Sequence, residues 1–281
     1  MRRALCLLCL SLLGAAVLAP AAGAEPARGA VFSGTGVWID IWDALEQQPA
    51  TVVATAQARG VSVIYVETAN AKSKVDVVNP APLKQLVVAA HAAGIRVVPW
   101  YLPGFRKQKV DRRRLAAAAA IGGTEPVDGV AVDIEATYVR NAALRSKRAA
   151  DLLAWLRATY PTLPIGAITP NPGSNYWPIF PWAEIHDNAD AVLPMCYPPR
   201  RLSADRMYAM TKDCATLPRT LIGDQAMPVH VISGLAGGLS PAGLDAAARG
   251  ARDGGANGFS LYDLATTTAA GWAALATWAN G

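Results

Sequence analysis

Short apolar runs alternate with longer Ala- and Leu-rich stretches along most of the chain. The apolar runs have the β-rich composition of buried strands and span 36–41, 61–66, 95–100, 129–134, 165–168, 191–196, 220–223 and 258–261. The stretches between them have helical patterns and span 50–59, 82–93, 112–120, 144–159, 204–215 and 240–253. Strands that alternate with helices indicate βαβ units and a parallel sheet.

The number of apolar runs favours one particular parallel architecture. Eight strands in about 250 residues are typical of a single (β/α)8 TIM barrel. The continuous apolar run 61–66 fits a sheet covered on both faces. Gly60, Gly94 and Asn257 stand just before strands, where a helix often ends in a left-handed residue. A doubly wound open sheet is the alternative, but segment 40–43 lacks the Gly-rich phosphate turn that such a sheet typically has after its first strand.

The residues that follow the predicted strands indicate where the function lies, because TIM barrels place their sites at the carboxyl ends of the strands. These residues are mostly acids, amides and aromatics: Asp40 and Trp42, Glu67 and Asn70, Trp100 and Tyr101, Asp133 and Glu135, Thr169 and Asn171, Tyr197, Asp224 and Gln225, and Tyr262 and Asp263. Tyr176 and Trp177 lie in a turn-rich loop after the fifth strand. We expect one or two of these aromatics to form a sugar platform, and the alternative is that they pack under loops. Since acids and amides bind hydroxyl groups and aromatic faces stack on C–H surfaces, the pattern predicts a sugar-binding pocket.

The fourth predicted strand and its flanks, 128–135, carry the most informative motif. Residues two apart share a face of a strand, so Ala131, Asp133 and Glu135 point one way and the intervening apolar residues the other. The two acids then enter the barrel mouth with Cα atoms roughly 6.5 Å apart. Two neighbouring carboxylates cannot both ionise freely, so one pKa rises and that carboxyl group can act as a general acid.

This strand resembles the Asp-x-x-Asp-x-Asp-x-Glu signature of glycoside hydrolase family 18, the chitinase-like barrels, with Asp128, Asp133 and Glu135 at three of its acids. Met195-Cys196-Tyr197 is similar to the Met-x-Tyr that ends the family's sixth strand. The resemblance implies hydrolysis of an N-acetylated amino-sugar polymer, in which Glu135 protonates the glycosidic oxygen. The substrate's own acetamido group then attacks the anomeric carbon, steadied by Asp133 and Tyr197, as in glycosidases that lack a nucleophilic carboxylate.

Two positions depart from the family pattern and leave alternatives open. Ala131 stands in place of the middle Asp, and Pro198 replaces the Asp that commonly follows the Tyr. A non-catalytic carbohydrate-binding barrel or an interaction scaffold is therefore an alternative, and the two acids could be a structural pair. Segment 36–40, Gly-Val-Trp-Ile-Asp, and the Asp-x-Glu of the fourth strand also resemble family 25 lysozymes, in which Asp40 would join Asp133 and Glu135 at a muramic-acid site. The alternative for Asp40 is a structural one, capping of the loop after the first strand.

The first residues predict export of the chain. A basic start, a short apolar run and a small-x-small site resemble a secretory signal peptide over residues 1–24, which leaves the barrel at 25–281. The apolar run is shorter than the ~20 residues of a membrane-spanning helix. The composition, with 52% hydrophobic and 17% charged residues, excludes a disordered chain.

Cys196 and Cys214 are the cysteines that remain after removal of the signal peptide. In an oxidising compartment they could form one bridge, and the alternative is two buried thiols. The three histidines have no ligand spacing, so we expect no metal and no cofactor.

Basic residues concentrate in segment 106–114. They form either a solvated surface or a site that attracts an acidic polymer such as a teichoic acid or a uronate chain. Modules that stack on bases are lacking, so we expect a glycan partner and neither nucleic acid nor membrane. We expect a monomer, although the sequence does not address oligomeric state.

Overall fold

Eight parallel strands close into a barrel in the order in which they occur along the chain. The computed structural model describes residues 27–42, 44–198 and 202–281. The strands are β1 (Gly34–Ile39), β2 (Val63–Asn70), β3 (Arg96–Leu102), β4 (Val130–Asp133), β5 (Ile165–Thr169), β6 (Ala191–Cys196), β7 (His230–Gly234) and β8 (Gly258–Tyr262). The predicted single (β/α)8 barrel is confirmed. The predicted signal peptide lies outside the described residues.

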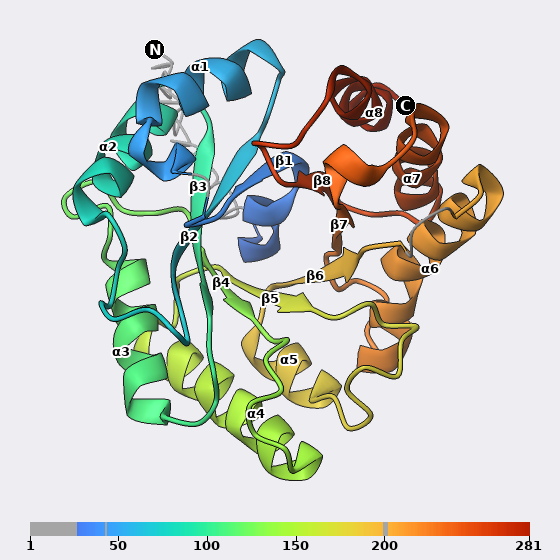
Figure 1. The fold of residues 1–281 in the computed structure, drawn as a ribbon. Coiled ribbons are helices and arrows are strands. Elements are labelled where there is room, and N and C mark those ends of the chain that lie inside the picture. The colour runs from blue at the N-terminus through green and yellow to red at the C-terminus, as the bar shows by residue number, and fades with distance from the viewer. Residues whose placement is uncertain (1–26, 43, 199–201) are drawn as a thin grey trace, which may run out of the picture.

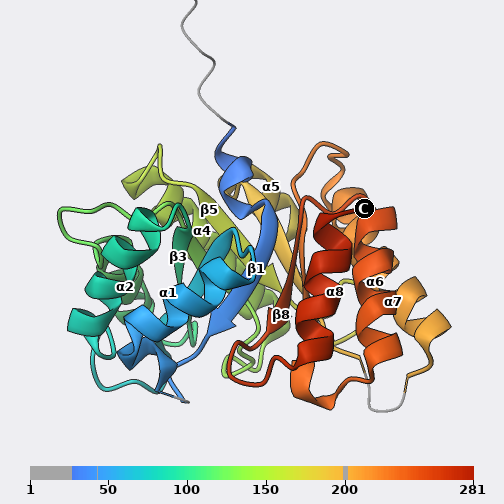
Figure 2. The same cartoon turned by 90° about the horizontal axis from the view of Figure 1, so that it is seen from above.

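Helices surround the barrel, as Figures 1 and 2 show from two directions. They are α1 (Pro49–Ala58), α2 (Pro80–Ala92), α3 (Gln108–Ala119), α4 (Ala142–Thr159), α5 (Trp182–Asn188), α6 (Ala204–Ile222), α7 (Pro241–Asp253) and α8 (Ala269–Ala279). In the described part of the chain, no helix combines the length and apolarity that a membrane crossing requires. A short 3-10 turn, Arg28–Phe32, precedes β1 and sends the Phe32 ring into the barrel interior. Gly166 of β5 accommodates that ring, because a Cβ there would lie only 2.7 Å from it.

The apolar core has two layers, which the alternation of β4 illustrates. Ala131 faces the barrel interior, where it joins a cluster with Trp38 and Tyr65. Val130 and Val132 point outward, into the cluster that the helices cover. The predicted alternation of β4 is therefore confirmed, and it directs the acids that follow Ala131 toward the mouth of the barrel.

The predicted strand at 220–223 is wrong. These residues form the end of α6, which Gly223 terminates in a left-handed conformation with φ of 80°. A run of four residues is too short for its periodicity to distinguish a strand from a helix end. The seventh strand is β7, which begins seven residues later at His230. Helices α5 and α8 were not among the predicted helices.

Helix ends and the cysteine pair settle two further expectations. Gly60 and Gly94 are left-handed as predicted, with φ of 65° and 71°. The prediction for Asn257 is wrong, because Gly255 takes that conformation, with φ of 72°. The side chain of Asn257 instead accepts a hydrogen bond from the Val229 N–H at 3.0 Å.

The two cysteines form a disulfide bond, which was one of the two alternatives. It joins β6 to α6 through Cys196 and Cys214.

Candidate active site

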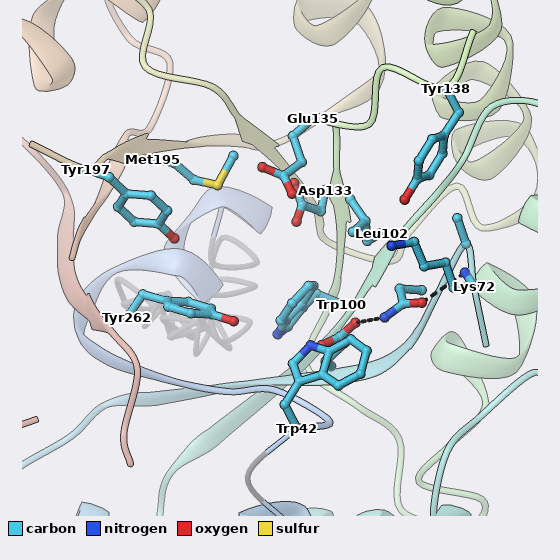
Figure 3. A pocket seen from close by; sticks show the side chains of 13 residues that line it. Trp42, Lys72, Trp100, Leu102, Asp133, Glu135, Tyr138, Met195, Tyr197 and Tyr262 are labelled. Atoms are coloured by element: carbon cyan, nitrogen blue, oxygen red, sulfur yellow. Dashed lines mark hydrogen bonds between the residues drawn. The ribbon is translucent and has the colours of Figure 1, made fainter. Parts of the chain in front are cut away.

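A cavity of ≈ 260 Å³ opens at the carboxyl ends of the strands. Its size is near the lower end of the range for small-molecule sites, about 300–1,000 Å³. Its lining comes from six strands and the loops that follow them: Trp42, Glu67, Asn70, Ala71, Lys72, Trp100, Leu102, Asp133, Glu135, Tyr138, Met195, Tyr197 and Tyr262. Figure 3 shows how these side chains surround the hollow.

The two acids of the fourth-strand motif lie together at this cavity, as predicted. Asp133 is the last residue of β4 and is buried, whereas Glu135 follows in the turn and is partly exposed. Burial, reinforced by the charges of Glu135 and Glu67, raises the pKa of Asp133 well above its ordinary value. Burial also raises the pKa of Glu135. The pair therefore retains a proton at a higher pH than two exposed carboxyl groups would.

Asp133 lacks the partners expected of a structural acid. Its Oδ1 atom is buried and has no hydrogen-bond partner among the described residues. Neither Asp133 nor Glu135 forms an ion pair within that part of the chain. Leaving a buried carboxyl oxygen unpaired costs about 1–3 kcal/mol, so stability does not account for its presence. Ala131, two residues earlier on the same face, provides no polar group to replace the acid of the family pattern.

Glu67 is a third carboxyl group in the cavity. It lies on β2 and accepts hydrogen bonds from the Asn70 side chain at 3.1 Å and the Ile41 N–H at 3.3 Å. Burial raises the pKa of Glu67 to about 7. The two hydrogen bonds lower this pKa, whereas the negative charges of Asp40 and Glu135 raise it further. Glu67 is therefore a second candidate for holding a proton near neutral pH.

Tyrosines form the side of the cavity opposite Tyr138 (Figure 3). The predicted site residue Tyr197 lines the cavity next to Met195, while Cys196 between them points to the helical layer. Burial and the charges of Asp133 and Glu135 raise the pKa of Tyr197 well above its ordinary value, so its hydroxyl keeps its proton and can donate.

Asp40 holds another tyrosine in place and does not itself line the cavity. Its carboxylate accepts the Tyr262 hydroxyl at 2.9 Å and the Trp42 N–H at 2.8 Å. Tyr262 lines the cavity as predicted. The structure thus gives Asp40 a positioning contact in place of the direct substrate contact expected from the sequence.

Two tryptophans supply flat apolar surfaces, as the sequence predicted. Trp100 at the end of β3 lies in the middle of the cavity wall (Figure 3). It is buried, and its indole N–H has no acceptor within the described residues. Trp42 lies at the rim and is 72% exposed, which is unusual for a residue that normally packs in the interior. An exposed aromatic face beside a polar cavity suits stacking on a sugar ring.

The loop after β4 contributes a residue that the sequence analysis missed. Tyr138 lies three residues after Glu135 and lines the cavity. Its position within the same short loop as the acid was the only available signal. The predicted Tyr176 is 53% exposed and donates its hydroxyl to the backbone oxygen of Glu135 at 3.1 Å, so it contacts this loop without lining the cavity.

Two predicted aromatic contacts are wrong, because these side chains face the helices. Tyr101 is fully buried and donates to Asp111 of α3 at 2.7 Å. It neighbours Trp100 on β3 and therefore points to the opposite face of the strand. Trp177 is 5% exposed, donates to Ser146 of α4 at 2.8 Å and lies under the Arg145 guanidinium.

Two predicted amide contacts also lie away from the cavity. Asn171 accepts a hydrogen bond from the Gly173 N–H at 2.9 Å, which forms a local turn in the loop after β5. Gln225 follows α6 and precedes β7, so it lies toward the amino ends of the strands. This second error follows directly from the misplaced seventh strand.

The first acid of the motif and the histidines have structural contacts. Asp128 precedes β4 and accepts hydrogen bonds from His91 at 2.9 Å and from the Val97 N–H at 2.7 Å. His230 is buried in the barrel and bonds the Phe32 carbonyl at 2.7 Å. The described residues contain no cluster of His, Cys, Asp and Glu that could hold a metal ion.

Comparisons with known proteins identify similar folds and no sequence family. No family model and no curated protein matches the chain. Solved structures do match its fold. The spore cortex-lytic enzyme SleL of Bacillus cereus has a TM-score of 0.66 at 8% identity, with 87% of this chain and 74% of SleL covered.

A class V chitinase mutant from Cycas revoluta in complex with (GlcNAc)3 has a TM-score of 0.64 at 10% identity, covering 89% of this chain and 100% of the chitinase. The catalytic domain of a Paenibacillus polymyxa beta-amylase has a TM-score of 0.59 at 9% identity, covering 88% and 97%. The chain shares its fold with these proteins. Structural similarity at such low sequence identity establishes the fold alone. The activity has to be inferred from the residues of the site.

Proposed function

We propose that the protein is a secreted glycoside hydrolase that cleaves an N-acetylated amino-sugar polymer by acid/base catalysis assisted by the substrate. The observation that carries the proposal is the unpaired, buried Asp133 carboxyl beside Glu135 in a cavity open to solvent. The fold shared with a chitinase bound to (GlcNAc)3 and with a cortex-lytic enzyme supports this substrate class. The N-terminal sequence pattern supports secretion.

The proposed chemistry assigns different tasks to the two acids. Glu135, whose raised pKa favours its protonated form, donates its proton to the glycosidic oxygen as the bond to the anomeric carbon breaks. The carbonyl oxygen of the substrate's acetamido group forms the new bond to that carbon. Water then attacks the same carbon and breaks its bond to the acetamido oxygen, which regenerates the acetamido group. Glu135 takes a proton from that water, which restores the enzyme and completes hydrolysis.

Asp133 and Tyr197 orient the acetamido group in this proposal. The acetamido N–H supplies the hydrogen bond that Asp133 Oδ1 lacks, and this bond favours the ionised form of Asp133. Ionisation of Asp133 next to Glu135 in turn keeps the proton on Glu135. The Tyr197 hydroxyl, which remains protonated, donates to the acetamido oxygen. Trp42 and Trp100 provide surfaces for the sugar rings.

Glu135→Gln tests the proposal, because the amide keeps the shape of the acid and cannot donate its proton in the same way. We expect the variant to lose about 10²–10⁴-fold in kcat on N-acetylglucosamine oligomers or peptidoglycan, the usual contribution of a general acid. Glu184→Gln, on the exposed face of α5, is the matched control and should retain full activity. Undiminished hydrolysis by Glu135→Gln would refute the mechanism. Oligosaccharide binding by the unmodified protein without any product would favour the non-catalytic alternative.

A further inference from the structure

A second pocket adjoins the acidic cavity and is not used by the proposed chemistry. It has a volume of ≈ 490 Å³ and lies between the loops after β2 and β3 and the start of α3. Ala71, Lys72 and Tyr138 line both the cavity and this second pocket. Figure 3 shows Lys72 and Tyr138 on one side of the cavity, opposite Tyr197. A polymer that extends from the acidic cavity past these two residues would enter the second pocket.

The second pocket is strongly positive, whereas the cavity is acidic. Five basic side chains line it: Lys72, Arg106, Lys107, Arg113 and Arg114. The one acid in its lining, Asp111, is buried and accepts bonds from the Tyr101 hydroxyl and from two backbone N–H groups. These three donors hold the Asp111 carboxylate from the protein side of the pocket.

Three of the five cations have no opposite charge beside them. Arg113 pairs with Asp76 at 2.7 Å, and Arg114 lies 3.9 Å from the same acid. The other three, Lys72, Arg106 and Lys107, form no ion pair with any residue in ranges 27–42, 44–198 and 202–281. Uncompensated like charges within one concave surface repel one another, and an anionic ligand would relieve this repulsion.

Side-chain contacts to the neighbouring loops position two of the arginines, the buried Arg114 and the exposed Arg106. Arg114 is 5% exposed and donates to the backbone oxygens of Asn70 and Ser73, on either side of Lys72. Arg106 donates through Nε to the Tyr138 carbonyl at 2.9 Å, and its guanidinium lies over the Tyr138 ring. Arg106 thus stands beside Tyr138, where the two pockets meet, with its terminal nitrogens left for a ligand.

We infer that this basic pocket binds a carboxylate carried by the sugar unit next to the one that is cleaved. Guanidinium and ammonium groups bind carboxylates through charge-assisted hydrogen bonds, and an arginine can do so through two of them. The inference rests on the proposed function and narrows its substrate. The preferred polymer alternates an N-acetylated amino sugar with a unit that carries a carboxylate, as peptidoglycan strands freed of their stem peptides and N-acetylglucosamine–uronate polymers do, in contrast to neutral chitin.

The test compares kcat/KM on three substrates of similar length: chitin oligomers, peptidoglycan glycan strands and an N-acetylglucosamine–glucuronate polymer. Lys107→Gln removes one cation from the basic pocket and lies outside the acidic cavity. Arg106→Gln removes a second cation, together with the contacts that Arg106 makes with Tyr138 of the cavity wall. Lys109→Gln, which removes an exposed cation of α3 outside the pocket, is the matched control.

We expect the unmodified protein to prefer a carboxylated polymer over chitin, and that preference to fall about tenfold in Arg106→Gln and in Lys107→Gln. Lys109→Gln should leave this preference unchanged, and activity on chitin should stay the same in Lys107→Gln and in Lys109→Gln. Added salt should reduce cleavage of the carboxylated polymer more than cleavage of chitin, because it screens the charges. The relative rates on the two carboxylated polymers identify the source of the carboxylate.

Two results would overturn the inference while the proposed function stands. One is an equal kcat/KM of the unmodified protein on chitin and on the carboxylated polymers. The other is an equal effect of Lys107→Gln and Lys109→Gln on this preference. If the unmodified protein cleaves none of the three substrates, the proposed function fails, and binding then tests the pocket by itself. Calorimetric affinity for peptide-free peptidoglycan strands that falls about tenfold in Lys107→Gln but not in Lys109→Gln would support the pocket. Equal affinity of the two variants would refute it.

Discussion

The two ends of β4 carry similar acids in opposite circumstances. Asp128, before the strand, accepts hydrogen bonds from His91 and from the Val97 N–H. Asp133, at the other end, is buried with an unpaired oxygen beside Glu135 and beneath an open cavity. The two aspartates are five positions apart, yet the protein provides hydrogen-bond donors for Asp128 and leaves Asp133 available to a ligand.

This difference distinguishes a residue that supports the barrel from one that acts in it. A buried acid with donors around it stabilises the fold, whereas a buried acid without donors costs stability and is retained for its chemistry. The family motif places both acids in a single pattern, so the pattern alone does not separate their roles. Replacing each acid should therefore have opposite consequences for activity and for stability.

The largest effect is expected for Asp133→Asn. The amide keeps the size of the side chain but cannot supply the negative charge that orients the acetamido group and holds the proton on Glu135. We expect kcat to fall by at least about 10²-fold, the lower range for an acid/base contribution. The unfolding free energy should stay the same or rise, because a buried unpaired carboxyl is removed. Activity assays with urea unfolding measure both, and full activity with lower stability would reverse the assignment.

Asp128→Ala should show the converse behaviour. The substitution removes the bonds to His91 and Val97, and bonds to a charged group contribute about 1.5–3 kcal/mol each. We expect a loss of about 3 kcal/mol or more in unfolding free energy. The kcat should stay within twofold of the value of the unmodified protein, measured where both proteins are folded. Asp128→Asn retains an acceptor for the Val97 N–H, so its unfolding free energy should fall by less than that of Asp128→Ala. A large fall in kcat with unchanged stability would place Asp128 in the catalytic machinery.

Glu67→Gln should give the smallest effect, and its sign depends on pH. A carboxyl whose pKa rises from 4.5 to about 7 on folding binds more protons in the folded state between these two values. Its ionisation therefore destabilises the fold as pH rises through this window, and the cost is absent below it. Glu67→Gln should gain about 1–2 kcal/mol at about pH 8, after allowing for the weaker bond to Asn70, and nothing at about pH 4. Equal effects at both pH values in thermal unfolding would contradict this titration.

Much of the barrel could be predicted because its strands are buried on both faces. Continuous apolar runs such as those at β2 and β6 are typical of strands in a covered parallel sheet, and their alternation with helices specifies that sheet. The run 220–223 failed because the last turn of an amphipathic helix and a short strand have the same apolar content. The observed β7 contains His230, Ser233 and Gly234. These buried residues are not apolar, so β7 does not appear in the sequence as a continuous apolar run.

The site residues could be predicted where the alternation of a strand determines the direction in which a side chain points. Asp133, Glu135 and Tyr197 follow from the face that each strand presents, and the same reasoning applied to adjacent residues separates Trp100 from Tyr101. Residues in loops could not be assigned in this way, because the direction of a loop side chain depends on tertiary contacts. Trp177, which packs on Ser146 and Arg145, and Tyr138, which enters the cavity, illustrate the two outcomes.

Carbon-13 NMR titration of the carboxyl groups would establish whether the acids at the barrel mouth act as a proton-holding pair. We expect Asp133 and Glu135 to titrate as a coupled pair, with midpoints above the ordinary values of 3.8 and 4.5, because Asp133 is buried, Glu135 is partly buried and the charge of Glu135 acts on Asp133. In Glu135→Gln the midpoint of Asp133 should fall, since a neighbouring negative charge is gone. Ordinary midpoints for both acids, with no response of Asp133 to the substitution, would show that the two carboxyl groups do not form such a pair.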